Sequence, residues 1–272
     1  MNDQPKVSII TVCFNSAKTI RDTIESVINQ TYDNIEYIII DGGSTDGTLD
    51  IIREYEPYIA KWVSEPDNGI YDAMNKGIKM ATGDIIGIIN SDDWYALDCI
   101  SSIVHTFITD PKIDVVHGNM VICDEDGIML YHIKSEVDIK KDLYKRMTVF
   151  HPTMFTKKAI YETEGLYHDK YLIAADYDLL FRVVRENYRI KNLDKELAFM
   201  RLGGISNSNH YQLAKENFHI RSENAINIFK NSVITLRGIL GPSARKVLDR
   251  IGLTCLTVCY RKHRYRNIRY YV

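Results

Sequence analysis

The stretch DIIGIINSDDW, residues 84–94, decides the predicted fold. Its first half is an almost continuous apolar run, which is typical of a strand buried on both faces of a sheet. The run ends in two adjacent carboxylates, Asp92 and Asp93. Two neighbouring carboxylates repel each other unless a cation such as Mg²⁺ or Mn²⁺ compensates them. On this stretch alone, a metal site and a solvated turn in which Ser91 or Asp93 caps the next helix both remain open.

The same succession of an apolar run and an amphipathic segment occurs three times before residue 84. Residues 6–14, 35–41 and 60–66 predict strands, and apolar residues at helical spacing follow each of them. Four such units predict an α/β domain with a mostly parallel sheet, flanking helices, and ligands beyond the carboxyl ends of the strands. The motifs VCFNSA, DGGSTDG, EPDNGIYD and NSDDW stand at these four ends.

The pattern changes after Ile113. Residues 113–133 predict two strands joined by the turn DEDG, and DYDLLFRVVREN (176–187) predicts a helix. A long amphipathic stretch follows at about 211–230. The second half of the chain therefore departs from the repeating β-α units of the first.

The composition indicates a folded protein, with 45% hydrophobic and 26% charged residues among 272. Five scattered cysteines without a CxxC pair favour neither a disulfide framework nor a zinc site, and a reducing cytosol is the expected setting. The start MNDQPK leads directly into a predicted strand, which leaves no room for a signal peptide. The late apolar run IGLTCLTVCY (251–260) is too short to span a bilayer.

Charge is distributed unevenly along the chain. The segment 236–272 has nine Lys or Arg and one acidic residue, so it carries about +8, whereas the preceding residues carry about −10. Because these basic residues alternate with Ile, Leu, Val and Tyr, we expect this basic tail to lie on anionic lipid as a peripheral membrane element. A nucleic-acid patch is the competing interpretation and is not the expected one.

The glycine-rich turn DGGSTDGT (41–48) opens a predicted helix. It does not match G-x-G-x-x-G, and no P-loop lysine follows, which argues against a dinucleotide or ATP site. Asp41 ends an apolar strand, where its carboxylate could accept hydrogen bonds from a ribose or a base. Equally, Asp46 and Ser44 could simply cap the helix.

The quoted motifs, together with IAADYDLLFR (173–182), resemble the family 2 glycosyltransferases in sequence and in order over roughly residues 6–206. The resemblance implies the GT-A fold, a nucleotide-diphosphate sugar as donor, and inversion at the anomeric carbon. It implies a nucleotide-binding half at about 1–120, an acceptor-binding half at about 121–206, and a C-terminal helical, basic extension at 207–272.

The resemblance also implies roles for individual residues. Base and ribose contacts are expected from Thr11, Phe14 and Asp41, with a further polar nucleotide contact from Asp67. The family's DXD-type metal motif corresponds to Ser91, Asp92 and Asp93, where Asp93 is the expected ligand of Mn²⁺ or Mg²⁺ and Asp92 lies nearer the ribose. Two departures concern the base pocket: many relatives have DDGS where residues 41–44 read DGGS, and many have an arginine where Met74 stands.

The general base is sought in AADYDL (174–179). On a helix, residues 176 and 178 point about 200° apart, so only one of the two aspartates can face a given cleft. The family's base motif aligns with Ala175 and Asp176, which implies that Asp176 is the base and that Asp178 has a structural role.

The predicted protein is thus a metal-dependent enzyme that moves a sugar from a UDP-sugar to a saccharide on a polyprenyl diphosphate. O-antigen, capsule or exopolysaccharide synthesis is the expected context, on the inner face of the cytoplasmic membrane. One alternative is a nucleotidyltransferase, although TVCFNSAKT (11–19) lacks its basic glycine-rich loop. Another is a catalytically silent nucleotide-sugar-binding scaffold.

Two features stay open on the sequence. His151, which precedes a proline, is either a packed side chain or an acceptor contact. The segment MRLGGISN (200–207) is either a plain turn or a loop that closes over the donor.

Overall fold

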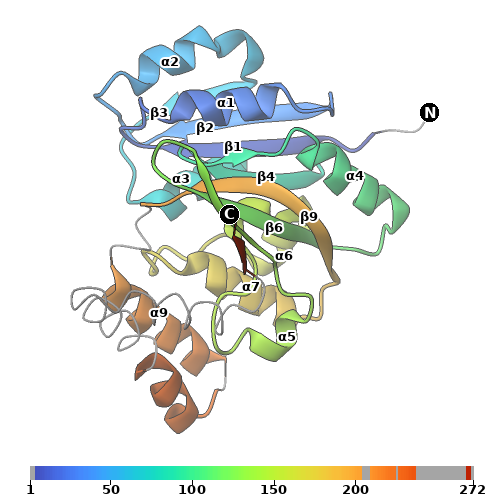
Figure 1. Cartoon of the computed structure of the whole chain (residues 1–272), viewed down its shortest axis with the longest axis vertical. Helices are drawn as coiled ribbons and strands as arrows, with labels where there is room; N and C mark the ends of the chain where they lie inside the picture. Colours follow the sequence, from blue (N-terminus) through green and yellow to red (C-terminus); the bar gives the residue numbers. More distant parts are fainter. Residues whose placement is uncertain (1–3, 204–208, 225, 237–267, 271–272) are drawn as a thin grey trace.

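The computed structural model describes residues 4–203, 209–224, 226–236 and 268–270. The first part consists of the predicted β-α units (Figure 1). Its strands are β1 (Val7–Cys13), β2 (Ile35–Asp41), β3 (Lys61–Ser64) and β4 (Ile85–Asn90). Its helices are α1 (Ile20–Ile28), α2 (Thr48–Glu54), α3 (Ile70–Met80) and α4 (Cys99–Thr109), with the short η1 (Glu56–Tyr58) before β3.

The second part contributes further strands to the same sheet. These are β5 (Trp94–Tyr95), β6 (Val115–Cys123), β7 (Met129–Ile133), β8 (Phe155–Lys157), β9 (Ile190–Arg201) and β10 (Ile268–Tyr270). Its helices are α5 (Ile139–Asp142), η2 (His151–Thr153), α6 (Lys158–Glu164), α7 (Ala175–Arg185) and α9 (His210–Glu223).

The strands form one mixed sheet in the order β10-β7-β6-β8-β4-β1-β2-β3. The four strands of the β-α units run parallel to one another, and β9 lies parallel to β6. β8 lies antiparallel between β4 and β6, so it joins the two parallel groups. The prediction of a mostly parallel α/β sheet is therefore confirmed, and the predicted strands around DEDG are the antiparallel pair β6 and β7.

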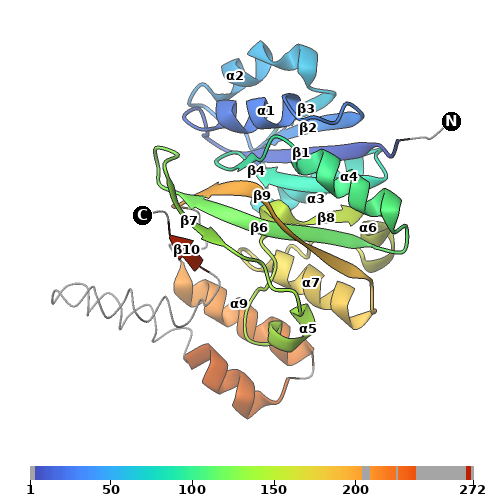
Figure 2. The ribbon, with the colours of Figure 1, turned by 45° about the vertical axis from the view of Figure 1, so that its right-hand side comes forward.

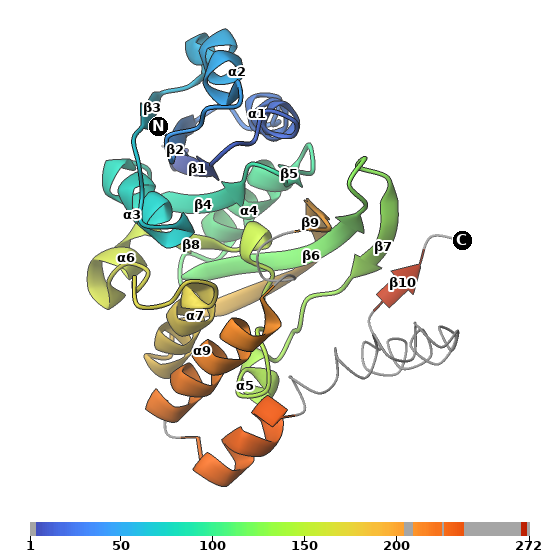
Figure 3. The ribbon, with the colours of Figure 1, turned by 90° about the vertical axis from the view of Figure 1, so that its left-hand side faces the viewer.

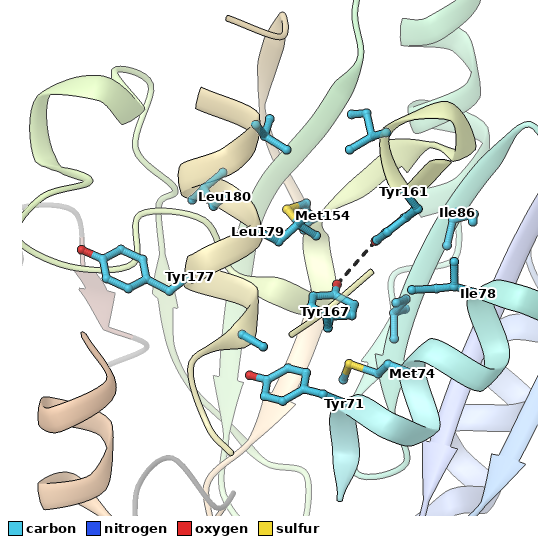
Figure 4. Packing of buried hydrophobic residues seen from close by; sticks show 14 of the residues in the cluster. Tyr71, Met74, Ile78, Ile86, Met154, Tyr161, Tyr167, Tyr177, Leu179 and Leu180 are labelled. Atoms are coloured by element: carbon cyan, nitrogen blue, oxygen red, sulfur yellow. Dashed lines mark hydrogen bonds between the residues drawn. The ribbon is translucent and has the colours of Figure 1, made fainter. Parts of the chain in front are cut away.

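Both faces of the sheet are covered. Alternate residues of the central strands pack into two apolar clusters, one against α3, α6 and α7 and the other against α1 and α4. Figure 4 shows part of the first cluster, in which Met74 and Ile78 of α3 lie beside Ile86 of β4. This double burial explains why the strands read as apolar runs instead of alternating patterns.

The antiparallel hairpin of β6 and β7 lies to one side of the parallel strands, near β5, as Figure 3 shows. Its tip packs on Trp94, because a Cβ on Gly127 would lie 3.7 Å from the Trp94 ring. Gly127 also has a φ of +84°, which a glycine adopts without strain. The tip therefore covers the residues that follow β4.

Helix α9 lies beside α7 (Figure 2), and Ile220 of α9 belongs to the same buried cluster as α7. The part of the C-terminal extension up to residue 224 thus shares the core of the preceding residues. Most of the basic tail, 237–267 and 271–272, lies outside the described residues. Within the described ranges, no helix combines the length and the apolar character that a membrane crossing requires.

Candidate active site

Polar side chains at the carboxyl ends of the four parallel strands bind one another. The Oγ atoms of Ser16 and Ser91 lie 2.7 Å apart, which joins the ends of β1 and β4. The backbone N–H of Ser16 donates to Oγ1 of Thr48 after β2, at 2.8 Å. Ser64, the last residue of β3, donates to Oδ2 of Asp41 at 2.7 Å. The four motifs therefore meet at one edge of the sheet, as predicted for the carboxyl ends of parallel strands.

The carboxylate pair lies in a buried turn at this edge. Asp93 is 1% exposed, and its Oδ1 accepts a hydrogen bond from the backbone N–H of Arg201. Burial, and then the neighbouring Asp92, raise the pKa of Asp93 well above its usual range. Burial also raises the pKa of Asp92, which is the more accessible of the two. Because burial and mutual repulsion disfavour the ionised forms, a cation bound beside the pair would stabilise both carboxylates.

Arg201, the last residue of β9, holds this turn in place. Its guanidinium donates to the carbonyl oxygen of Asp92 at 2.9 Å and forms an ion pair with Asp22 of α1. It also lies 4.5 Å from the centre of the Trp94 ring, within cation–π distance. The Trp94 ring also stacks on the ring of Phe199 in β9; the two ring centres are 5.3 Å apart and the ring planes are nearly parallel. Trp94 thus anchors the turn to β9 and to Arg201.

The described residues hold no cluster of three or more His, Cys, Asp or Glu side chains that could chelate a metal. Mg²⁺ sites in nucleotide enzymes commonly use one or two protein carboxylates and complete the shell with phosphate oxygens and water. The turn offers such a donor set, with two oxygen ligands at a site whose negative charge is only partly balanced by Arg201. The residues therefore fit a cation that enters together with a diphosphate, and Asp93 and Asp92 would hold it.

Phe14, Gly42 and Asp67 converge beside the ends of β1, β2 and β3. The Phe14 side chain is 62% exposed, although it is large and apolar. A Cβ added to Gly42 would lie 2.5 Å from Oδ2 of Asp67 and 3.4 Å from the Phe14 ring. The missing side chain of Gly42 thus makes room for the Asp67 carboxylate. An exposed ring beside a carboxylate suits a base, which can stack on the ring and donate an N–H to the acid.

Thr11, one of the predicted nucleoside contacts, has no exposed surface in this structure. Thr11 is 0% exposed, and its hydroxyl lies 3.0 Å from the hydroxyl of Tyr37 on β2. Thr11 lies in the middle of β1, which is buried on both faces, so its side chain does not reach the protein surface.

Asp41, the other predicted strand-end contact, is likewise 0% exposed. Its carboxylate accepts hydrogen bonds from the backbone N–H groups of Gly43 and Ser44 and from the hydroxyls of Ser44 and Ser64. Although burial by itself would raise the pKa of Asp41, these hydrogen bonds lower it. In this structure Asp41 therefore holds the glycine turn in shape.

Asp176 lies in the first turn of α7 and is partly exposed. Its Oδ1 accepts hydrogen bonds from the backbone N–H of Tyr177 at 2.8 Å and from the hydroxyl of Tyr71 at 3.3 Å. Burial raises the pKa of Asp176 to about 6. Such a carboxylate is largely ionised at neutral pH yet basic enough to accept a proton.

Tyr71 ties this helix to the edge where the strand motifs meet. It is the second residue of α3, which begins directly after the EPDNG motif that follows β3. Figure 4 shows Tyr71 between α3 and the start of α7. The first turn of α7 therefore lies next to the first turn of α3.

Asp178, two residues farther on, has a different environment. It is buried and forms an ion pair with Arg182 at 3.0 Å, and Nδ1 of His168 lies 2.9 Å from the same oxygen. Arg182 in turn donates to the backbone carbonyls of residues 164–166. The structural role predicted for Asp178 is therefore present.

Two open features of the sequence have different outcomes. Nε2 of His151 lies 3.1 Å from the hydroxyl of Tyr167, and burial lowers the pKa of His151 to about 4. His151 is thus a neutral, packed side chain in this structure. The proposed loop at 203–206 falls mostly outside the described residues, since 204–208 are not among them.

No local pattern in the sequence singles out Arg201 or Tyr71 as site residues. Both stand inside motifs that were noted for other residues, Arg201 beside the glycines of MRLGGISN and Tyr71 within EPDNGIYD. Neither has a local spacing that predicts its partner, because those partners lie about 100 residues away along the chain.

Comparison with known proteins agrees with this geometry. The model of the family described as "Glycosyl transferase family 2" matches residues 8–166, which include all four strand-end motifs. A PGL/p-HBAD biosynthesis glycosyltransferase of Mycobacterium bovis BCG is 29% identical over 182 residues, which cover 65% of this chain and 69% of that protein.

Two solved structures have a similar fold. One is a mannosyltransferase from Pyrobaculum calidifontis in complex with GDP-Man and Mn²⁺, with a TM-score of 0.65 at 17% identity. The match covers 96% of this chain and 81% of the mannosyltransferase chain. Residues 1–349 of S. aureus TarS, in complex with UDP-GlcNAc, have a TM-score of 0.64 at 18% identity and cover 86% of this chain and 71% of that one. With this α/β GT-A fold and a family match over more than half of its length, the chain belongs to glycosyl transferase family 2.

Proposed function

We propose that this glycosyltransferase moves a sugar from a UDP-sugar to a lipid-linked saccharide and inverts the anomeric carbon. The proposal rests on two carboxylate sites, the second of which Tyr71 connects to the segment that follows β3. One is the turn of Asp92 and Asp93 at the end of β4, and the other is Asp176, whose pKa of about 6 suits a base. The first fits a diphosphate with its cation, and the second fits an acceptor hydroxyl.

The donor would bind along the strand ends. Phe14 and Asp67 would contact the base, while Asp92 and Asp93 would hold Mn²⁺ or Mg²⁺ and, with Ser91, lie near the diphosphate and ribose. A cation bound there would neutralise the negative charge that grows on the leaving diphosphate. Arg201 would keep the turn in one conformation, since it binds the Asp92 carbonyl and the Trp94 ring.

The transfer step would use Asp176 as general base. The acceptor hydroxyl loses its proton to Asp176 while its oxygen attacks the anomeric carbon, and the bond from that carbon to the diphosphate oxygen breaks. Attack from the side opposite the leaving group inverts the configuration. The hydroxyl of Tyr71 holds the carboxylate in position through its hydrogen bond.

The choice of UDP is a proposal about the base. The two similar structures contain UDP-GlcNAc and GDP-Man, so one fold serves both bases. Calorimetric titration of the enzyme with UDP, GDP and their sugar conjugates tests it, and tighter binding of GDP than of UDP would refute UDP as the donor nucleotide.

The acceptor and its location are proposed from the basic tail and from one relative. The similar M. bovis protein is named for PGL/p-HBAD biosynthesis. We propose a saccharide on a polyprenyl diphosphate as acceptor, in O-antigen, capsule or exopolysaccharide synthesis, at the inner face of the cytoplasmic membrane. Replacing Arg261, Lys262, Arg264 and Arg266 by Glu should then weaken binding to vesicles containing anionic lipid, measured by flotation. Unchanged binding would remove the tail from this role.

Release of UDP and formation of glycosylated product test the reaction itself. The full-length enzyme should release UDP only with a divalent cation, and Asp93→Asn should abolish the cation-dependent part. Asp176→Asn should bind the donor normally but lower transfer by about 10²- to 10⁴-fold. If no donor and acceptor pair gives UDP release, the protein is a binding scaffold. Normal transfer by Asp176→Asn would refute the choice of base.

A further inference from the structure

We propose that Glu216 of α9 is a positioning residue for the general base, so that the C-terminal extension completes the active site. This inference rests on the proposed role of Asp176 as base. Glu216 does not reach the reacting atoms; it acts through residues 172–174, the segment directly before α7.

The Glu216 carboxylate binds three successive backbone N–H groups. Oε1 accepts from Leu172, and Oε2 accepts from Ile173 and Ala174, each at 2.9 Å. The amide of Gln212, one turn earlier on α9, donates to Oε1 at 2.7 Å. All four donors are neutral, so the charge of Glu216 is stabilised by hydrogen bonds alone.

The bound segment sets the start of α7. Ala174 is the residue that caps this helix, and its side chain cannot accept a hydrogen bond from the first turn. Glu216, which is 4% exposed, binds the N–H group of this capping residue and those of the two residues before it, so it fixes the path by which the chain enters α7. The direction in which α7 begins, and with it the place of Asp176, therefore depends on α9.

Tyr71 binds the same segment, but through a backbone carbonyl group instead of an N–H group. Its hydroxyl donates to the carbonyl oxygen of Ile173 at 2.7 Å and lies 3.3 Å from Oδ1 of Asp176. One hydroxyl thus links the backbone that Glu216 holds to the carboxylate of the base. A shift of residues 172–174 would disturb both contacts at once.

Glu216 also contributes to the charge around Asp176. The titratable groups that face Asp176 are Tyr71 from α3, Tyr167 from the segment between α6 and α7, and Glu216 from α9. The negative charge of Glu216 adds to burial in raising the pKa of Asp176. Removing that charge should therefore make Asp176 a weaker base, which ionises at lower pH.

The test compares Glu216→Gln, Glu216→Asp and the matched control Glu223→Gln in the full-length enzyme. Glu223 lies on the same helix and binds side chains of the same loop, Lys170 and Tyr171, but not the backbone at 172–174. A Gln at 216 keeps the shape but puts an NH₂ group against backbone N–H donors. We expect its kcat to fall by about 100-fold, the loss associated with a misplaced catalytic group.

Three further readouts separate positioning from loss of folding. Glu216→Gln should lower the thermal midpoint, because it leaves buried N–H groups without an acceptor. Donor affinity and kcat are therefore measured at a temperature at which both proteins are folded; donor affinity should stay near that of the wild type, so the change falls on kcat. The acid limb of the pH profile of kcat should move to lower pH, because the base has lost a negative neighbour. Glu216→Asp, which keeps the charge, should recover part of kcat and the original acid limb. Glu223→Gln should leave kcat and the limb unchanged.

Two results would overturn the inference. If Glu216→Gln has the kcat and acid limb of the wild type, Glu216 does not position the base. If its activity falls only in proportion to the folded fraction, its role is structural. A failure of the proposed function is distinguishable, because in that case Asp176→Asn itself would retain transfer.

Discussion

Asp176 and Asp178 differ by two positions in the first turn of α7, yet the fold gives them opposite roles. Asp178 faces Arg182 and is neutralised inside the protein. Asp176 faces Tyr71 and receives no cation, so burial opposes its ionisation. Side-chain direction on the helix separates the two, and the partners on other elements decide what each one does.

Replacing Asp176 by Asn should stabilise the protein as it abolishes transfer. The pKa of Asp176 is raised from 3.8 in the unfolded chain to about 6 in the folded one. Its contribution is therefore neutral below pH 4, becomes unfavourable as the pH rises, and reaches its full cost above pH 6. An Asn keeps an acceptor for Tyr177 and Tyr71 and avoids this cost.

Thermal unfolding of the wild type and Asp176→Asn at pH 4.5 and pH 8 measures the effect. The midpoint of the variant should exceed that of the wild type by more at pH 8 than at pH 4.5. An equal difference between the two midpoints at both pH values would mean that the pKa of Asp176 is not raised in the folded state. The wild-type kcat/KM should rise with pH through about 6, since only the ionised base is active.

The contribution of Arg201 to donor binding can be tested by a substitution that keeps its charge. Replacing it by Lys keeps the charge but loses the planar fork that binds the Asp92 carbonyl and Asp22 together. Loss of a hydrogen bond to a charged group costs about 1.5 to 3 kcal/mol, so we expect donor affinity in the presence of Mn²⁺ to fall by about 10- to 100-fold.

Arg21→Lys is the matched control for Arg201→Lys. Arg21 forms a surface ion pair with Glu54 and does not contact the carboxylate turn. Both variants are compared by titration with UDP and Mn²⁺. Similar losses in the two variants would show that charge or general stability, not the geometry at the turn, is responsible.

At the scale of elements, the turn after β2 packs closely against the turn after β3, where Gly42 lies against the Asp67 side chain. Gly42→Ala would place a Cβ 2.5 Å from Oδ2 of Asp67, closer than real Cβ atoms approach, so the Asp67 carboxylate must leave its place beside Phe14. We expect UDP affinity to fall by about 10-fold, an effect of about 1.4 kcal/mol, which is within the usual cost of a forced contact.

A double-mutant cycle separates this contact from other effects. With Asp67→Ala as background, the Cβ at residue 42 would meet only the Phe14 ring edge, at 3.4 Å. Gly42→Ala should therefore cost little further affinity in that background. If it costs the same in both backgrounds, the two turns are not coupled through Asp67.

The elements themselves were largely predictable. The predicted strand at 35–41 coincides with β2, and the other three differ from β1, β3 and β4 by one or two residues at their ends. This agreement follows from double burial, which makes the central strands apolar at most positions and leaves clusters of polar residues to mark their ends. The antiparallel insertion of β8 between β4 and β6 has no such local signal, because pairing partners are chosen in space.

At the scale of the whole molecule, Glu36 holds together the edge of the sheet opposite to the site. It accepts hydrogen bonds from Ser8 at the start of β1, from Thr82 before β4, and from Lys61 at the start of β3. Burial by itself would raise the pKa of Glu36, but these hydrogen bonds lower it to about 2. Glu36 therefore stabilises the fold above the pKa of the unfolded chain, 4.5, and this stabilisation is lost as the pH falls towards 2.

Glu36→Gln should lower the free energy of unfolding at pH 7 by about 3 kcal/mol, which corresponds to the difference between the two pKa values. The difference from the wild type should shrink below about pH 4. Urea unfolding at several pH values measures it, with Glu54→Gln as a control on a surface ion pair that should change stability by less than about 1 kcal/mol. A loss for Glu36→Gln that does not depend on pH would contradict the role of its charge.

The sequence by itself determined the α/β architecture and the family, and it singled out Asp92, Asp93 and Asp176 as candidate site residues, because apolar runs and motif order are local properties of the chain. Only the tertiary structure decided that Thr11 and Asp41 are buried, and that Arg201, Tyr71 and Glu216 bind at or beside the carboxylates proposed to be catalytic. Exposure and contact depend on elements that meet only when the chain has folded, such as the partners of Arg201 and Tyr71, which lie more than 100 residues away along the chain. No spacing in the sequence records those meetings, because the sheet and its helices create them when they pack.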